Sequence, residues 1–136
     1  MHTWLPLVNR RPKLLVVDDQ PTNIRVLHQL FRDDCELFMA TNGEQALSVC
    51  QSQLPDLILL DVIMEGLDGH EVCRRLKADP ATADIPIIFV TAVNVTDMDR
   101  LRGYKLGAVD YVMVPVIPEI LRSKVEVLAE LHRKRR

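Results

Sequence analysis

Several kinds of site are missing from this sequence, and each absence narrows its function. The three cysteines, Cys35, Cys50 and Cys73, are odd in number and widely spaced, so they form neither a disulfide framework nor a metal-binding motif. We expect them to be small buried hydrophobic residues in a reducing cytoplasm. The four histidines form no ligand pair, and we expect His28 and His70 to be partly exposed on helices.

Excess charge and long apolar runs are also absent. The formal net charge is −2, which gives no general argument for binding nucleic acid or a membrane surface. No apolar run approaches the length that spans a bilayer, and the first residues lack the apolar stretch of a signal peptide. We therefore expect a cytoplasmic protein that contacts neither a membrane nor nucleic acid directly.

Two short apolar runs that end in aspartate are the most informative feature that is present. Residues 13–17 precede Asp18 and Asp19, and residues 57–60 precede Asp61. Short continuous apolar runs are typical of strands buried on both faces of a parallel sheet. Ligands of such sheets bind just outside the carboxyl ends of the strands, so the three aspartates are expected to meet in one pocket.

Three ionised carboxylates in one pocket need a cation between them. Two unit charges about 4 Å apart repel by roughly 4 kcal/mol at an effective dielectric constant of about 20. Carboxylate oxygens suit Mg²⁺, so we expect this ion as the cofactor. An aspartate beside bound Mg²⁺ can also act as a nucleophile toward a phosphoryl group.

Strand and helix patterns alternate five times along the chain. Strands are expected at 13–18, 35–40, 56–60, 85–90 and 109–113, with a helix after each. Such alternation with short loops predicts an α/β fold, a doubly wound five-stranded parallel sheet of flavodoxin type. We expect a flexible leader at 1–12, one domain at 13–131, and a basic helix end at 132–136.

Short motifs in this order resemble the receiver domain of a two-component response regulator over residues 13 to 131. The acidic pair Asp18-Asp19 follows the first strand, and Asp61 stands at the phosphoacceptor position. Later segments also match, namely the turn Asp68-Gly69, the fourth strand with its switch threonine in Val90-Thr91-Ala92, and the approach to the fifth strand in Gly107-Ala108-Val109-Asp110-Tyr111.

The resemblance implies a phosphorylation switch rather than an enzyme. A histidine kinase would transfer a phosphoryl group to Asp61, and the domain would then act on an output domain or a downstream protein. Thr91 would contact the phosphoryl group, and Tyr111 would be the switch aromatic that turns inward. The Mg²⁺ ligands would be the side chains of Asp18, Asp19 and Asp61 and the backbone carbonyl of Ile63.

Two residues depart from the family pattern. Val114 stands where the family usually has a lysine that contacts the acceptor and its phosphoryl group, and Glu65 replaces a usual proline. The valine motivates an alternative, a degenerate receiver that binds proteins without phosphorylation. A third reading, a hydrolase with an aspartate nucleophile, ranks last because Ile63 occupies the position where a second carboxylate would act as acid or base.

The last helix has two interpretations. Leu121, Val125, Leu128 and His132 approximate the seam of a coiled coil that continues toward an output domain. The same spacing also fits an ordinary amphipathic helix whose basic end favours the helix dipole. The sequence leaves the cognate kinase, the output and the formation of a homodimer open.

Overall fold

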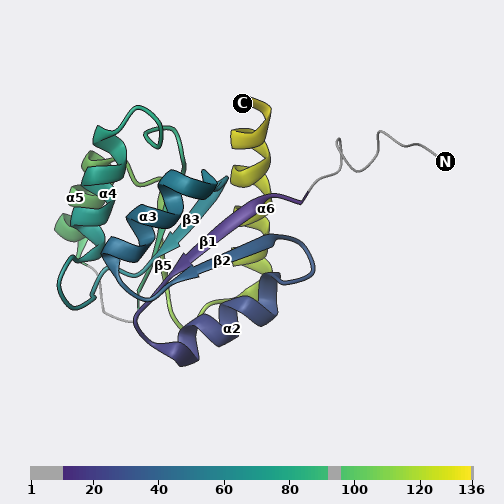
Figure 1. The fold of residues 1–136 in the computed structure, drawn as a ribbon. Helices are drawn as coiled ribbons and strands as arrows, with labels where there is room; N and C mark the ends of the chain where they lie inside the picture. The colour runs from purple at the N-terminus through teal and green to yellow at the C-terminus, as the bar shows by residue number, and fades with distance from the viewer. Residues whose placement is uncertain (1–10, 92–95, 136) are drawn as a thin grey trace.

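Five parallel strands form one sheet in the computed structural model, which describes residues 11–91 and 96–135. The sheet order is β2-β1-β3-β4-β5, so β1, β3 and β4 lie inside it and β2 and β5 form its edges (Figure 1). The elements are, in chain order, β1 (Lys13–Val17), α2 (Pro21–Phe31), β2 (Glu36–Ala40), α3 (Gly43–Gln53), β3 (Leu57–Leu60), α4 (Gly69–Ala78), β4 (Ile87–Thr91), α5 (Asp97–Leu106), β5 (Asp110–Met113) and α6 (Pro118–Arg135). The expected α/β architecture is confirmed.

Burial explains which strands stand inside the sheet. All four residues of β3 and all five of β4 are buried, whereas the edge strands β2 and β5 keep partly exposed side chains. The predicted strand at 85–90 begins later than expected, at Ile87, because Pro86 has no N–H to donate to a neighbouring strand. Helix starts were predicted well, since Pro21 and Pro118 both begin helices.

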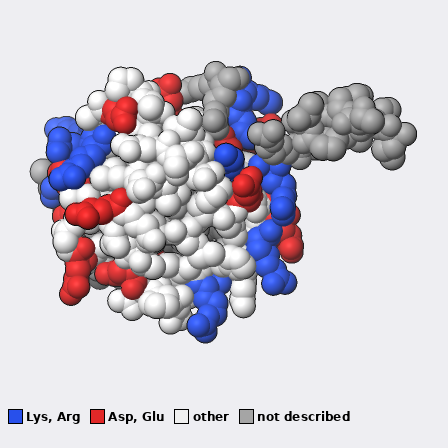
Figure 2. Space-filling model, in the orientation of Figure 1, with Lys and Arg blue, Asp and Glu red and all other residues white. Residues whose placement is uncertain are grey.

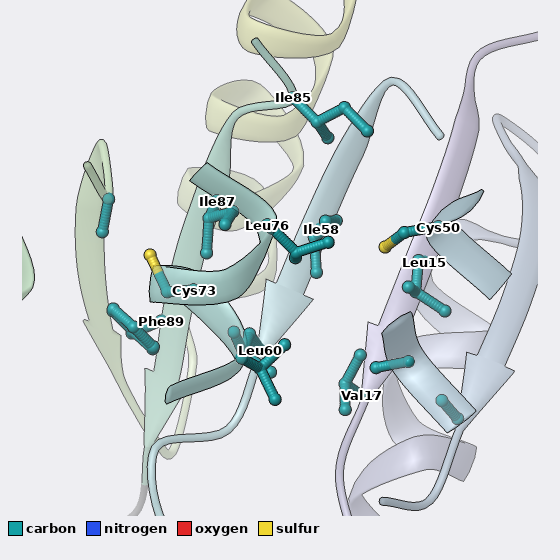
Figure 3. Packing of buried hydrophobic residues seen from close by; sticks show 14 of the residues in the cluster. Leu15, Val17, Cys50, Ile58, Leu60, Cys73, Leu76, Ile85, Ile87 and Phe89 are labelled. Carbon is teal, nitrogen blue, oxygen red and sulfur yellow. The ribbon is translucent and has the colours of Figure 1, made fainter. Parts of the chain in front are cut away.

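Alternate residues of each strand point to two separate cores. One core lies under α3 and α4, and Figure 3 shows it packed around Leu60, Cys73 and Phe89. The other core lies under α2 and α6, where Phe31 and Val125 pack on the sheet. All three cysteines are buried, as predicted.

Helix α6 crosses the sheet from its carboxyl edge to its amino edge. Leu121, Val125 and His132 are 1%, 1% and 8% exposed, so these residues pack inward and the coiled-coil interpretation of this face is wrong. At the far end, His132 Nδ1 lies 3.1 Å from Asp56 Oδ1, and Asp56 Oδ2 accepts the Lys13 backbone N–H at 2.8 Å. The last turns of α6 are therefore fixed against the start of β1 and β3.

The surface carries charges of both signs. Figure 2 shows basic and acidic side chains scattered around the rim of one face, with an uncharged area between them. No helix in the described part of the chain is both long and apolar enough to span a membrane.

Candidate functional site

The three aspartates singled out in the sequence meet at the carboxyl edge of the sheet. Asp18 and Asp19 follow β1, and Asp61 follows the neighbouring strand β3. One carboxylate oxygen from each of the three lies within 4.8 Å of the others. A cavity of about 230 Å³ opens there, and it is lined by Asp18, Asp19, Gln20, Asn23, Asp61, Ile63, Val90 and Val114.

Asp18 is held in a fixed orientation. Its side chain is buried, Oδ1 accepts the Gln20 backbone N–H at 2.8 Å, and Oδ2 accepts the Asn23 side-chain amide at 3.1 Å. Burial nevertheless raises the pKa of Asp18 above its ordinary value, although these hydrogen bonds oppose the rise. The backbone turn after β1 thus positions this carboxylate in a site where burial disfavours its charged form.

Asp61 is the most perturbed carboxylate of the group. Burial, followed by the charge of Asp18, raises the pKa of Asp61 to about 6, while hydrogen bonds from backbone N–H groups oppose the rise. One of these bonds runs from the Ile63 N–H to Asp61 Oδ1 at 3.3 Å. A cation placed between the carboxylates would relieve this repulsion.

The loop after Asp61 is clamped by a glycine at the start of α4. The Gly69 N–H donates to the Val62 carbonyl at 2.9 Å, and a Cβ atom on Gly69 would stand only 2.1 Å from the Asp61 carbonyl oxygen. Only glycine permits this approach without moving the backbone. The Asp68-Gly69 turn therefore fixes the backbone that carries Asp61.

Part of the cavity lining is apolar. Ile63, Val90 and Val114 contribute it, and none of the described residues that line the cavity is a lysine or an arginine. Val114 is held beside β4 by a hydrogen bond from its N–H to the Thr91 carbonyl at 3.0 Å. The position that the sequence marked as lacking its usual lysine thus faces the acidic group with a hydrocarbon side chain.

The other residues singled out lie behind the cavity or away from it. Thr91 ends β4 and is 1% exposed, and Tyr111 lies on the neighbouring β5 and is 7% exposed. Neither lines the cavity, and Glu65 is an exposed loop residue that does not line it either. The ring of Tyr111 points inward, with its centroid 5.0 Å from that of Phe89.

Comparisons with known proteins decide the family. Residues 14–126 match the family model described as the response regulator receiver domain. The chain belongs to this family. The Caulobacter vibrioides protein named "Response regulator PleD" is 41% identical over 117 residues, which are 85% of this chain and 26% of that protein.

Further relatives share the domain in other contexts. A "Probable transcriptional regulator ycf27" of Pyropia yezoensis is 40% identical over 118 residues, covering 86% of this chain and 47% of the relative. A crystal structure of a putative response regulator from Chloroflexus aurantiacus superposes with a TM-score of 0.82 and 32% identity, covering 89% of this chain and 99% of that one. This receiver domain therefore spans about a quarter to a half of the curated relatives' length.

One residue beside the receiver site was misjudged from the sequence. His70 was expected to be partly exposed, but it is only 7% exposed, and its Nε2 lies 2.9 Å from the Tyr111 hydroxyl. The spacing from His70 to buried Cys73, three residues later, was the available signal, because positions i and i+3 share a helix face. Nothing in the local sequence named Tyr111 as the partner.

Proposed function

We propose that this receiver domain accepts a phosphoryl group on Asp61 from the phosphohistidine of a histidine kinase. The observation that carries the proposal is the meeting of Asp18, Asp19 and Asp61 in one cavity. An oxygen of Asp61 attacks phosphorus and forms a P–O bond, while the P–N bond to the donor imidazole breaks. The departing nitrogen keeps the electron pair of that bond. The donor leaves as neutral imidazole once this nitrogen has taken a proton from water.

The donor set fits Mg²⁺. Two ligand oxygens on one Mg²⁺ ion stand about 3 to 4 Å apart, which the grouping of the three carboxylates allows. The side chains of Asp18, Asp19 and Asp61 and the backbone carbonyl of Ile63 would hold the ion. When bound, Mg²⁺ neutralises the carboxylates and the charge on the phosphoryl oxygens.

Residues behind the cavity would transmit the modification. The hydroxyl of Thr91 would donate to a phosphoryl oxygen, and Tyr111 would couple β5 to that contact. Membership of the family suggests that the domain regulates an output domain or a downstream protein. We propose residues 13–131 as the receiver domain, 1–12 as a leader and 132–136 as the approach to a linker. We also keep the expectation of a cytoplasmic protein without direct nucleic acid contact.

A second function is favoured by one observation, the apolar wall at Val114. A lysine there would link the phosphoryl charge to Thr91 and Tyr111. A hydrogen bond to a charged group contributes about 1.5–3 kcal/mol, whereas inverting a two-state equilibrium from 1:99 to 99:1 needs roughly 5.5 kcal/mol. The alternative is therefore a degenerate receiver that binds its partner whether or not it is phosphorylated.

Incubation with acetyl phosphate and Mg²⁺, followed by intact mass, tests the main proposal. We expect one phosphoryl adduct on the native chain and on the control Asp84→Asn, which changes an exposed loop aspartate. We expect no adduct on Asp61→Asn. An equal adduct on Asp61→Asn would overturn the assignment, and a folded native chain that takes no adduct would favour the degenerate receiver.

A further inference from the structure

A ring cluster surrounds Tyr111 between α4, α5 and the sheet, in which His70 and Phe89 are buried and Tyr104 is 43% exposed. The Phe89 ring centroid lies 5.0 Å from that of Tyr111, and His70 meets Phe89 edge-on at 5.2 Å. The ring of Tyr104, from α5, stands perpendicular to Tyr111 at 5.9 Å. These are the separations at which aromatic rings attract one another, so the inward ring of Tyr111 is packed on several sides.

The Tyr111 hydroxyl has two hydrogen-bond partners in this orientation. It donates its one proton to the Asp99 carbonyl oxygen at 3.0 Å. The His70 Nε2, at 2.9 Å, must therefore donate to the hydroxyl oxygen, which requires a proton on Nε2. Burial, and then the charge of Arg102, lowers the pKa of His70, against the opposing charges of Asp68 and Asp99. The neutral Nε2–H tautomer and the charged ring both supply this donor.

Helix α5 leaves room for the ring at one residue. Gly103 is buried, and a Cβ atom there would stand 2.3 Å from the Tyr111 hydroxyl oxygen. Any larger residue at this position would push the tyrosine ring out. The packing, the two hydrogen bonds and the glycine all favour the same orientation, and none of them involves the acidic cavity.

We propose that His70 is a positioning residue that holds Tyr111 inward with no phosphoryl group on Asp61, so that β5 and α5 present the same surface in both states. The inference rests on the second of the two proposed functions, the degenerate receiver, because Tyr111 keeps one orientation whether or not Asp61 carries a phosphoryl group, whereas under the first proposal it would move. The inference also adds a mechanism to that function. Val114 removes the lysine link to the phosphoryl group, whereas His70 and Asp99 hold Tyr111 by hydrogen bonds that need no phosphoryl group.

The Tyr111 ring signal offers a direct test. The chain has two tyrosines, so ring-labelled tyrosine gives two sets of NMR signals, and Tyr104→Phe assigns them. Spectra are recorded with Mg²⁺, with and without beryllofluoride, which mimics a phosphoryl group on a carboxylate. In the native chain we expect the Tyr111 ring shifts to stay unchanged, while the amide shifts of Asp61 and Ile63 move as the mimic binds.

Variants at His70 separate the hydrogen bond from general packing. In His70→Leu the donor is lost, and loss of one hydrogen bond weakens the inward orientation about five- to tenfold. We expect its Tyr111 signals to move toward the shifts of an exposed ring and to respond to beryllofluoride. In His70→Gln the side-chain amide can still donate, so we expect native Tyr111 shifts to be largely restored.

Two results would overturn the inference. One is a native Tyr111 ring signal that moves strongly when beryllofluoride binds, and the other is identical Tyr111 shifts in the native chain, His70→Leu and His70→Gln. Failure of the proposed function looks different, because the Asp61 and Ile63 amides would then not respond to beryllofluoride at all. The comparison of the two His70 variants without the mimic still tests the anchor in that case.

Discussion

Strand β3 has an aspartate next to each end, and the electrostatic surroundings of the two carboxylates are opposite in kind. Asp56, at the amino end, is 3% exposed, and its two oxygens meet His132 and the Lys13 N–H. Asp61, at the carboxyl end, has two other aspartates for neighbours and a pKa raised to about 6. A carboxylate whose charge is matched by its partners stabilises the fold, whereas a carboxylate crowded by like charges marks a candidate ligand site.

Removing the compensated carboxylate is expected to have the largest effect. Asp56→Ala leaves the buried His132 and the partly buried Lys13 N–H without this acceptor, so the free energy of unfolding should fall by about 2–4 kcal/mol. Urea denaturation with a chelator present measures it. The exposed control Asp84→Ala should change the free energy by less than about 0.5 kcal/mol. Equal stability of Asp56→Ala and the native chain would remove the contrast between the two ends of β3.

Removing the crowded carboxylate should have the opposite sign. The pKa of Asp61 is raised from 3.8 to about 6, so folding is favoured with Asp61 protonated, and its contribution to stability is complete below pH 4 and lost as pH rises through 6. The rise corresponds to about 3 kcal/mol in full and about 1–2 kcal/mol after solvent screening.

The isosteric variant Asp61→Asn tests this pH dependence. Without metal at pH 7 it should be about 1–2 kcal/mol more stable than the native chain, and it should lack most of the native loss of stability between pH 4 and pH 6. Denaturation curves at several pH values measure both effects. A native-like slope in Asp61→Asn would assign the pH dependence to other groups.

Adding a cation to the crowded end should have a smaller effect. Mg²⁺ at ten times its Kd should stabilise the native chain by about 1.4 kcal/mol. In Val114→Lys an ammonium group would face the same carboxylates and repel the metal, so we expect Mg²⁺ affinity to fall several-fold, by about 1 kcal/mol. Calorimetric titration measures it, with Val114→Met as the uncharged control. Unchanged Mg²⁺ affinity in Val114→Lys would show that position 114 does not face the metal, and tighter binding would contradict the expected repulsion.

Local signals in the sequence predicted the sheet and the acidic group. Strands that end in aspartate and helices that begin at proline, or at Thr96 with its capping box, are determined by residues a few positions apart. Because β1 and β3 are parallel neighbours, Asp18, Asp19 and Asp61 lie together at the carboxyl edge of the sheet, and this placement depends little on the rest of the chain. The acidic cavity could therefore be foreseen from the order of the elements.

Side-chain pairs across the sheet could not be foreseen. His70 and Tyr111 are 41 residues apart, and His132 and Asp56 are 76 residues apart, so each contact depends on how two elements pack. A polar residue on a helix gives the same sequence pattern whether it faces water or a hidden partner. For this reason both histidines were assigned without their partners, and the buried face of α6 resembled a coiled-coil seam.

The anchored end of α6 also determines what can be attached to the domain without blocking it. Helix α6 has 18 residues, so it carries the chain about 27 Å from the carboxyl edge of the sheet to the amino edge. The described chain also starts at that edge, beside the first residue of β1, as Figure 1 shows. Both ends of the described chain therefore lie at the edge of the sheet opposite the mouth of the acidic cavity.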